Sequence, residues 1–306
     1  MAQRRATPLA TARCARTHPR RRVQAIGSVG SPATQRRAGT AVVITAGMMR
    51  TLLSIAVLLL NLAAGMARAA EADTGIVLLH GKWDKPPTLV QPLGRQLEAA
   101  GYRVATPAMP WSGLREYDVG YPQALAEIEA AALALRDKGA RRIVVIGQSF
   151  GGNGALAYAA SGRAVDAIAV LSPGHTPERE QFRKAVEASV EKARAMRAAG
   201  QGADKAWFDD RNQRMSRTVR TTADIYFSYF DPEGLGNMQL TAAKVPAGVP
   251  IFMAVGTADG MAGVAEASIL RKAPPNEKSL YLLLPADHLS LVNVVAPELI
   301  GWLRAL

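Results

Sequence analysis

From about residue 75 to the C-terminus, short apolar runs alternate with longer segments that have the period of a helix. The runs are rich in Val, Ile and Leu, as buried strands of a parallel sheet are. Strands that alternate with helices in this way indicate helices packed on both faces of a mostly parallel sheet. We therefore predict a doubly wound α/β fold. Its strands are expected at residues 76–79, 102–105, 142–146, 167–171, 250–255 and 279–284.

The alternation stops between residues 171 and 249. This region is charged, has a helical period and is interrupted by several glycines and a proline. A further strand–helix unit would not have this composition, so we predict a helical cap inserted at about residues 174–247. The helices of the main domain are expected at about residues 88–100, 122–138, 151–161, 261–272 and 291–305.

The charge of the chain is distributed unevenly. The net charge of +12 would suit a nucleic-acid or membrane binder. Residues 1–69, however, hold eleven Arg and no Lys, Asp or Glu, which leaves 26 basic and 25 acidic residues in 70–306. The folded part is therefore nearly neutral and has no nucleic-acid footprint. The single cysteine, Cys14, also lies in residues 1–69, so the body of the protein, residues 70–306, has no disulfide and no thiolate metal site.

Residues 48–69 have the pattern of a secretory signal peptide. Arg50 supplies a positive charge, residues 52–60 form a short apolar run, and Ala67-Arg68-Ala69 fits a cleavage site. A membrane anchor is the alternative, but it needs about 20 apolar residues. We expect cleavage after Ala69 and export to the periplasm or the medium. Residues 1–47 should not pack, and they indicate a start assigned too far upstream or a long targeting region.

The strongest local motif is Gly-Gln-Ser-Phe-Gly at residues 147–151, directly after one expected strand and directly before a helix. A nucleophile needs its oxygen held out of such a sharp turn, and the glycines let the turn close without a side-chain clash. The first N–H groups of the helix also point toward developing negative charge. The motif predicts Ser149 as a nucleophile.

A serine nucleophile needs a base, and the base needs an orienting acid. His288 follows the last expected strand, and Asp259 follows the strand before it, so the chain order is Ser, Asp, His. Both lie where an open parallel sheet assembles its site. Asp259 could instead be a turn residue before Gly260. Asp287 is expected to shape the histidine loop, and Asp231 is a weaker acid candidate.

These motifs, together with His80-Gly81-Lys82-Trp83 after the first strong strand, resemble the α/β-hydrolase superfamily over about residues 75–306. The resemblance implies a Ser149–His288–Asp259 triad and an oxyanion hole made of backbone N–H groups. One N–H would come from Phe150 and the other from Lys82 or Trp83, with His80 in a structural role. Because the first strand starts soon after Ala69, the sheet should lack the two leading strands of many members.

The cap carries two ambiguous features. Residues 176–220 hold eleven Lys or Arg against seven Asp or Glu, which indicates either a solvated face or attraction of an anionic substrate or an acidic envelope surface. Aromatic residues also concentrate here and would line an acyl pocket or form the core of the cap. They are Trp207, Phe208, Tyr226, Phe227, Tyr229 and Phe230. His175 would lie at the edge of the site, as a pocket residue or as a structural hydrogen-bonding group.

The sequence thus predicts an exported serine hydrolase that cleaves small or medium acyl esters through an acyl-enzyme, with no metal or organic cofactor. An amidase, peptidase or thioesterase would use the same groups. A binding protein on the same fold, with an unproductive triad, is the alternative from another class. The sequence leaves the natural substrate and the oligomeric state open.

Overall fold

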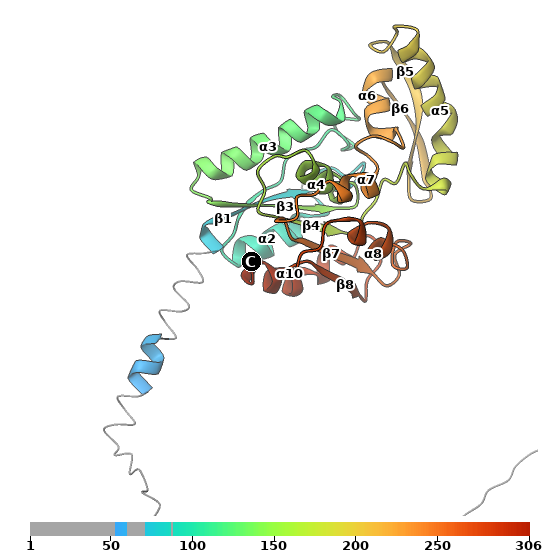
Figure 1. Ribbon diagram of the computed structural model, residues 1–306. Helices are drawn as coiled ribbons and strands as arrows, with labels where there is room; N and C mark the ends of the chain where they lie inside the picture. Colours follow the sequence, from blue (N-terminus) through green and yellow to red (C-terminus); the bar gives the residue numbers. More distant parts are fainter. Residues whose placement is uncertain (1–52, 60–70, 87) are drawn as a thin grey trace, which may run out of the picture. The chain divides into compact units, whose positions relative to one another are not determined.

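The computed structural model describes residues 53–59, 71–86 and 88–306 (Figure 1). The predicted extension 1–47 and most of the predicted signal peptide 48–69 lie outside the described residues, and residues 53–59 are helical. In the described part of the chain, no helix is both long and apolar enough to span a membrane.

The main domain contains a six-stranded parallel sheet with strand order β2-β1-β3-β4-β7-β8. All six predicted strands are present, with ends that shift by one or two residues. The bounds are β1 Thr74–Leu79, β2 Arg103–Ala105, β3 Arg142–Gln148, β4 Ala167–Leu171, β7 Ile251–Gly256 and β8 Leu280–Leu284. The order reverses between β1 and β3, which is where an open parallel sheet forms its site.

Helices cover both faces of the sheet, as the continuous apolar strands predict. Successive side chains of a strand point to opposite faces. Val77 and Leu79 therefore join the core under α3 (Tyr121–Asp137) and α4 (Phe150–Ala160). Ile76 and Leu78 join the core under α2 (Gln91–Ala99) and α10 (Ala296–Arg304). The predicted doubly wound α/β fold is confirmed.

Two predicted helices are shorter or broken in the structure. The helix expected at 291–305 splits into α9 (Leu291–Val294) and α10, because Pro297 has no N–H to continue the first helix and suits the first turn of the second. The helix expected at 261–272 is reduced to α8 (Ala265–Ser268) and a 3-10 turn at Leu270–Lys272.

The insertion is not wholly helical, which corrects the sequence-based prediction. It contains α5 (Glu180–Ala198), α6 (Ala223–Phe230) and α7 (Met238–Ala243), but also the antiparallel hairpin of β5 (Lys205–Asn212) and β6 (Met215–Thr222). Phe208 and Asp210 alternate inward on β5, and Val219 and Thr221 do so on β6. Because Asp210 is charged, the alternation of buried and exposed residues along β5 does not show as an alternation of apolar and polar residues in the sequence.

The hairpin and the two longer helices of the insertion form a unit beside the carboxyl ends of the main sheet (Figure 1).

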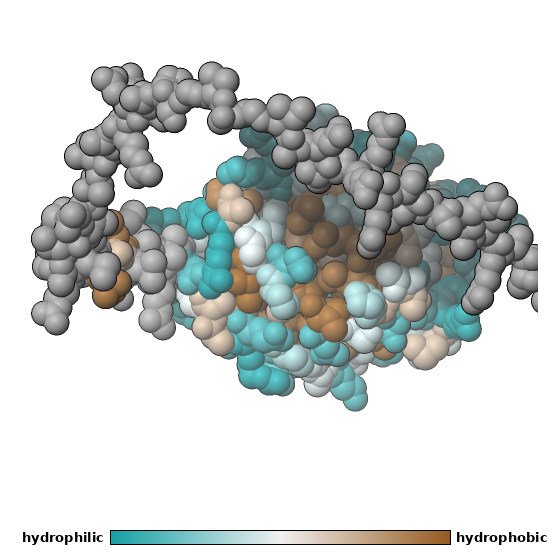
Figure 2. Space-filling model, turned by 90° about the horizontal axis from the view of Figure 1, so that it is seen from below, coloured by the Kyte–Doolittle hydropathy of each residue, from teal (hydrophilic) through white to brown (hydrophobic). Residues whose placement is uncertain are grey.

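At the far edge of that sheet, β8 exposes Leu280 and Leu283. The face seen in Figure 2 gathers apolar residues in its middle and borders them with hydrophilic residues.

Candidate active site

Ser149 occupies the sharp turn between β3 and α4, with φ 55° and ψ −117°. This left-handed conformation is strained for a residue with a side chain, and such strain is typical of functional turns. The flanking glycines make the turn possible. A Cβ added at Gly147 would lie 2.0 Å from the backbone of Gly151, and one added at Gly151 would lie 2.5 Å from the Leu79 carbonyl oxygen.

The structure brings Ser149, His288 and Asp259 into one chain of hydrogen bonds. The Ser149 hydroxyl donates to His288 Nε2 over 2.9 Å. His288 Nδ1–H donates to Asp259 Oδ2, also over 2.9 Å. Asp259 follows β7 and His288 follows β8, so parallel strand ends place both beside the turn that carries the serine.

Asp259 is held as a charged carboxylate. Burial raises its pKa, but hydrogen bonding to His288, the charge of His288 and the Met261 N–H together bring the pKa below its ordinary value. A carboxylate opposite Nδ1 keeps the imidazole proton on that atom, so Nε2 is free to accept a proton from Ser149. The arrangement is that of an activated nucleophile.

Two further contacts fix the loop that carries His288. Gln148 Nε2–H, one residue before the serine, donates to the backbone oxygen of His288 over 3.1 Å. The Asp287 carboxylate accepts from the N–H groups of Leu289 and Ser290. Asp287 therefore shapes the loop, as expected. The role of Gln148 was not predicted, because residue spacing does not show which way a side chain in a motif points.

The structure distinguishes the two backbone N–H groups that were expected as alternatives for the second oxyanion donor, those of Lys82 and Trp83. The Trp83 N–H already donates to the Trp111 carbonyl over 2.9 Å, so Trp83 is not available for this role. This leaves the Lys82 N–H beside that of Phe150, which is the first residue of α4. An N–H in the first turn of a helix has no partner inside the helix.

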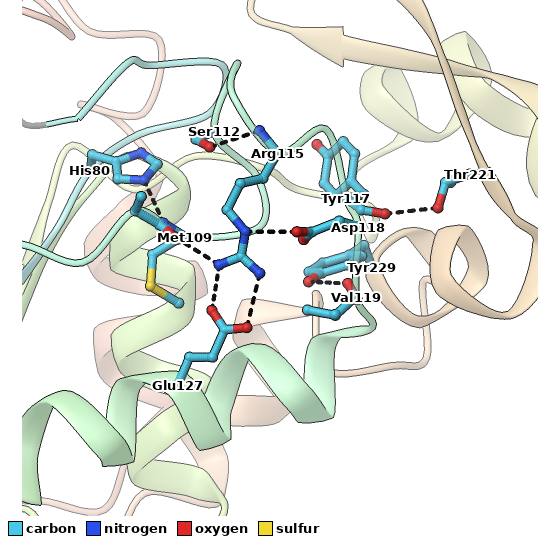
Figure 3. A network of polar contacts seen from close by, with 11 residues as sticks. His80, Met109, Ser112, Arg115, Tyr117, Asp118, Val119, Glu127, Thr221 and Tyr229 are labelled. Carbon is cyan, nitrogen blue, oxygen red and sulfur yellow. Dashed lines mark hydrogen bonds and ion pairs between the residues drawn. The ribbon is translucent and has the colours of Figure 1, made fainter.

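His80 is a structural residue of the loop beneath Lys82. The Met109 N–H donates to His80 Nε2 over 3.0 Å, so the imidazole proton is on Nδ1 and is donated to the Gly81 carbonyl. Figure 3 shows that the segment after β2, which carries Met109, is tied to α3 by Arg115, whose guanidinium binds both oxygens of Glu127. Burial lowers the pKa of His80, which favours its neutral form. These contacts hold the backbone at Lys82 in place.

Two cavities meet at His288. The first, here the serine cavity, has a volume of about 580 Å³. Its lining includes Lys82, Trp83, Asp84, Leu89, Gln148, Ser149, Asn212, Gln213, Met215, His288 and Leu289. The second, here the arginine cavity, has a volume of about 550 Å³. Its lining includes Gly174, His175, Arg179, Arg211, Gln213, Arg214, Asp259, Met261, Asp287, His288 and Leu289.

The aromatic residues of the insertion line neither cavity, which contradicts the acyl-pocket alternative, and all of them except Trp207 pack in or against the core of the insertion instead. Tyr226 and Phe230 are buried and stack with their centroids 4.2 Å apart. Phe227 packs under the guanidinium of Arg197. Trp207 is 60% exposed on the outer side of β5. The sequence shows that aromatic residues concentrate in this region, but it does not show which way their side chains point.

His175 lines the arginine cavity but is almost wholly enclosed. Its ring stacks on Phe150 at 4.0 Å, and Nε2–H donates to the Tyr229 carbonyl over 2.7 Å. Burial, helped by the charge of Lys82, lowers its pKa well below the ordinary value. The structural interpretation of this histidine is therefore favoured, since it joins the turn of the nucleophile to α6.

We expect His175 to make stability depend on pH. The unfolded chain takes up a proton on this side chain below about pH 6.5, and the folded chain does not. The free energy of unfolding should therefore fall as the pH drops from 7.5 to 5.5, with a slope of at most about 1.4 kcal/mol per pH unit from this group. Urea unfolding of the protein and of a His175→Gln variant checks this.

The variant should show a smaller loss on acidification. His80 acts in the same direction as His175, and Glu178, whose pKa is raised to about 7 by burial, acts in the opposite direction. Both groups are present in the two proteins, so the difference isolates His175. Equal slopes would contradict the prediction.

Gly174 lies against the candidate nucleophile Ser149, and a Cβ added to this glycine would be 2.5 Å from Ser149 Oγ. A Gly174→Ala change should push the hydroxyl out of line with His288. Because a misplacement of about 1 Å costs roughly a hundredfold in rate, we expect kcat/KM to fall by about that factor. Gly248→Ala is the matched control, since no atom lies within 4 Å of its added Cβ. Equal activities of the two variants would refute the steric argument.

Lys82 forms a buried ion pair that the sequence did not suggest. Its Nζ lies 2.6 Å from Asp210 of the hairpin, and both side chains are almost fully enclosed. Tyr117 and the Trp83 indole N–H donate to the other Asp210 oxygen. The candidate oxyanion residue Lys82 is thus also anchored to the insertion by its side chain. Among the described residues, no three His, Cys, Asp or Glu side chains converge as a metal site requires.

Comparison with known proteins agrees with this geometry. The sequence model of a family described as "Alpha/beta hydrolase family" matches residues 76–299. A search of curated proteins gives no match. Among solved structures, one from work on LipS and LipT, two metagenome-derived lipolytic enzymes, is 15% identical. It aligns over 76% of this chain and 94% of its own with a TM-score of 0.54.

Two further structures show the same likeness. A Paleococcus ferrophilus monoacylglycerol lipase is 17% identical, with a TM-score of 0.53, over 76% of this chain and 94% of its own. A carboxyl esterase from Bacillus coagulans is 14% identical, with a TM-score of 0.54, over 76% and 88%. At these identities the likeness concerns the fold.

Proposed function

The chain belongs to the α/β-hydrolase family, and from that premise we propose that it is a serine hydrolase of carboxylic esters. Ser149 is the nucleophile, His288 the general base and Asp259 the orienting acid. The observation that carries the proposal is the pair of 2.9 Å hydrogen bonds that join the three side chains. The similar lipase and esterase folds favour ester substrates over amides.

The reaction proceeds in two halves. Ser149 Oγ attacks the acyl carbonyl as its proton passes to His288 Nε2, and the N–H groups of Phe150 and Lys82 stabilise the oxyanion. His288 then protonates the leaving alkoxide, and the ester bond breaks to give an acyl-enzyme. Water, deprotonated by the same imidazole, releases the acid and restores Ser149.

The proposal is tested with p-nitrophenyl esters of rising acyl length, with matched amides and thioesters assayed in parallel. Turnover of esters by the protein that disappears in its Ser149→Ala variant supports the proposal, and the preferred acyl length measures the acyl site. Turnover of amides or thioesters alone would replace the ester proposal. The absence of turnover, together with no labelling by a serine-directed phosphonate, would favour a binding role.

We further propose that the enzyme is exported. The proposal rests on the pattern of residues 48–69, with its apolar run and its Ala-Arg-Ala end. Expression in a bacterial host, followed by N-terminal sequencing of the protein recovered outside the cytoplasm, tests it. A new N-terminus at Ala70 is expected, and an uncleaved protein in the cytoplasm would overturn the proposal.

A further inference from the structure

Three arginines, Arg179, Arg211 and Arg214, are among the residues that line the arginine cavity. In the described part of the chain, none of the three forms an ion pair with a carboxylate. Other arginines of the domain, such as Arg115 and Arg163, form ion pairs with glutamates. Three arginines without an ion-pair partner thus line one cavity beside the catalytic histidine, and among the described residues only Arg179 has a carboxyl group, that of Glu178, acting on it through charge.

The two carboxylates that line the same cavity form no ion pair with these arginines. Asp259 is committed to His288. One Asp287 oxygen accepts hydrogen bonds from the backbone of Leu289 and from both the backbone and the hydroxyl of Ser290. The guanidinium of Arg179 donates to the sulfur of Met261, which is a weak acceptor that a ligand oxygen can displace. Because three arginines outnumber two carboxylates in this lining, the arginine cavity favours an anion.

The serine cavity has the opposite character. Trp83, Leu89, Met215 and Leu289 give it an apolar wall. Its acidic residue, Asp84, has one oxygen buried without a hydrogen-bond partner among the described residues. An anionic substrate group would be repelled there, and an acyl chain would be accepted.

The chemistry decides which part of the substrate enters which cavity. His288 Nε2 must protonate the leaving oxygen, so the leaving group departs on the side of the imidazole. His288 lines both cavities, but Ser149 and Lys82 are among the residues that line the serine cavity and not the arginine cavity. The acyl group therefore lies in the serine cavity and the leaving group in the arginine cavity.

We propose that the substrate is an ester whose leaving alcohol carries a carboxylate or a phosphate, bound by Arg179, Arg211 and Arg214. This inference rests on the proposed ester hydrolysis and names its substrate class. A guanidinium presents two parallel N–H donors that match either anion, and such charge-assisted bonds are stronger than neutral ones. Three of the basic residues in 176–220 thus line one cavity, from the start of α5 and from the tip of the hairpin, where they would bind the anion.

The first test measures binding without catalysis. The Ser149→Ala variant is titrated with 4-butyryloxybenzoate and with its neutral methyl ester by calorimetry. The anion should bind more tightly. In the Arg179→Gln, Arg211→Gln and Arg214→Gln backgrounds its affinity should fall by about tenfold for each arginine that contacts the anion. Arg220→Gln, on the exposed side of β6, removes the same charge from the same hairpin and should leave the affinity unchanged.

The second test uses turnover by the protein with Ser149 intact. The ratio of kcat/KM for 4-butyryloxybenzoate to that for its methyl ester should fall in the arginine variants, and the intrinsic reactivities of the two esters cancel in the comparison. Mono(4-nitrophenyl) glutarate, which carries its anion on the acyl side, should not be preferred over p-nitrophenyl butyrate. A phosphate analogue, 4-butyryloxyphenyl phosphate, shows which anion is bound better. Thermal unfolding confirms that each variant is folded.

The outcomes separate this inference from the proposed function. Equal binding of the acid and its methyl ester, or an equal loss in Arg220→Gln, would overturn the anion site even if neutral esters are hydrolysed. A preference for the glutarate that depends on the arginines would overturn the placement of the leaving group. Arginine-dependent binding of the anion without hydrolysis of any ester would support the anion site and remove the proposed ester chemistry.

Discussion

Replacing Ser149 with alanine is expected to lower kcat by about a millionfold, and replacing His288 in the same protein should add almost nothing. The residues of a triad act as a unit, so the loss of one removes the contribution of the others. The structure shows that unit as two hydrogen bonds, with His288 between the hydroxyl and the carboxylate. Steady-state kinetics of the two single variants and the double variant measure the effect.

The neighbouring carboxylates provide a matched comparison. Asp259→Asn should cost about 10⁴-fold in kcat, because an amide opposite Nδ1 favours the wrong tautomer of the imidazole. Asp287→Asn, one residue from the histidine, should stay within a few-fold of the parent, since an amide oxygen still accepts from the loop backbone. Additive losses for Ser149 and His288, or similar losses for the two aspartates, would contradict the triad. Unchanged melting temperatures would exclude misfolding as the cause.

Much of the main domain could be predicted from the sequence because its signals are local. Each buried strand is a short apolar run, and a parallel sheet gathers the carboxyl ends of its strands at one edge. The order Ser149, Asp259, His288 then places three distant residues together without any knowledge of loop shapes. The split of the last helix at Pro297 was also present in the sequence as a local signal.

The structure of the insertion was predicted less well, because contacts between residues that are distant in the sequence determine which of its side chains are buried. Asp210 is inward on β5 only because Lys82, 128 residues earlier, supplies its counter-charge. A pattern search treats such an aspartate as a surface residue. In the same way, Trp83 is excluded as an oxyanion donor by a bond to Trp111 that spacing does not reveal.

The ion pair between Lys82 and Asp210 leads to the largest expected effect on stability. Asp210→Asn leaves the Lys82 ammonium buried without a counter-charge, and breaking a buried pair in this way costs about 3–5 kcal/mol of unfolding free energy. The asparagine oxygen still accepts from Tyr117 and from the Trp83 indole, so the charge is the main change. Urea unfolding at constant pH measures the loss.

A second substitution and a pH series separate charge from packing. The double variant Lys82→Met/Asp210→Asn removes both charges, keeps the oxygen acceptor and should recover most of the lost stability. Burial already lowers the pKa of Lys82 in the parent protein against the opposing effect of Asp210, and Asp210→Asn removes that opposing effect. The folded state then binds fewer protons than the unfolded state, so the stability of this variant should rise as the pH increases toward 10. Two outcomes would show that shape and not charge holds the hairpin to the site. One is a double variant as unstable as Asp210→Asn, and the other is a loss of unfolding free energy in Asp210→Asn that does not depend on pH.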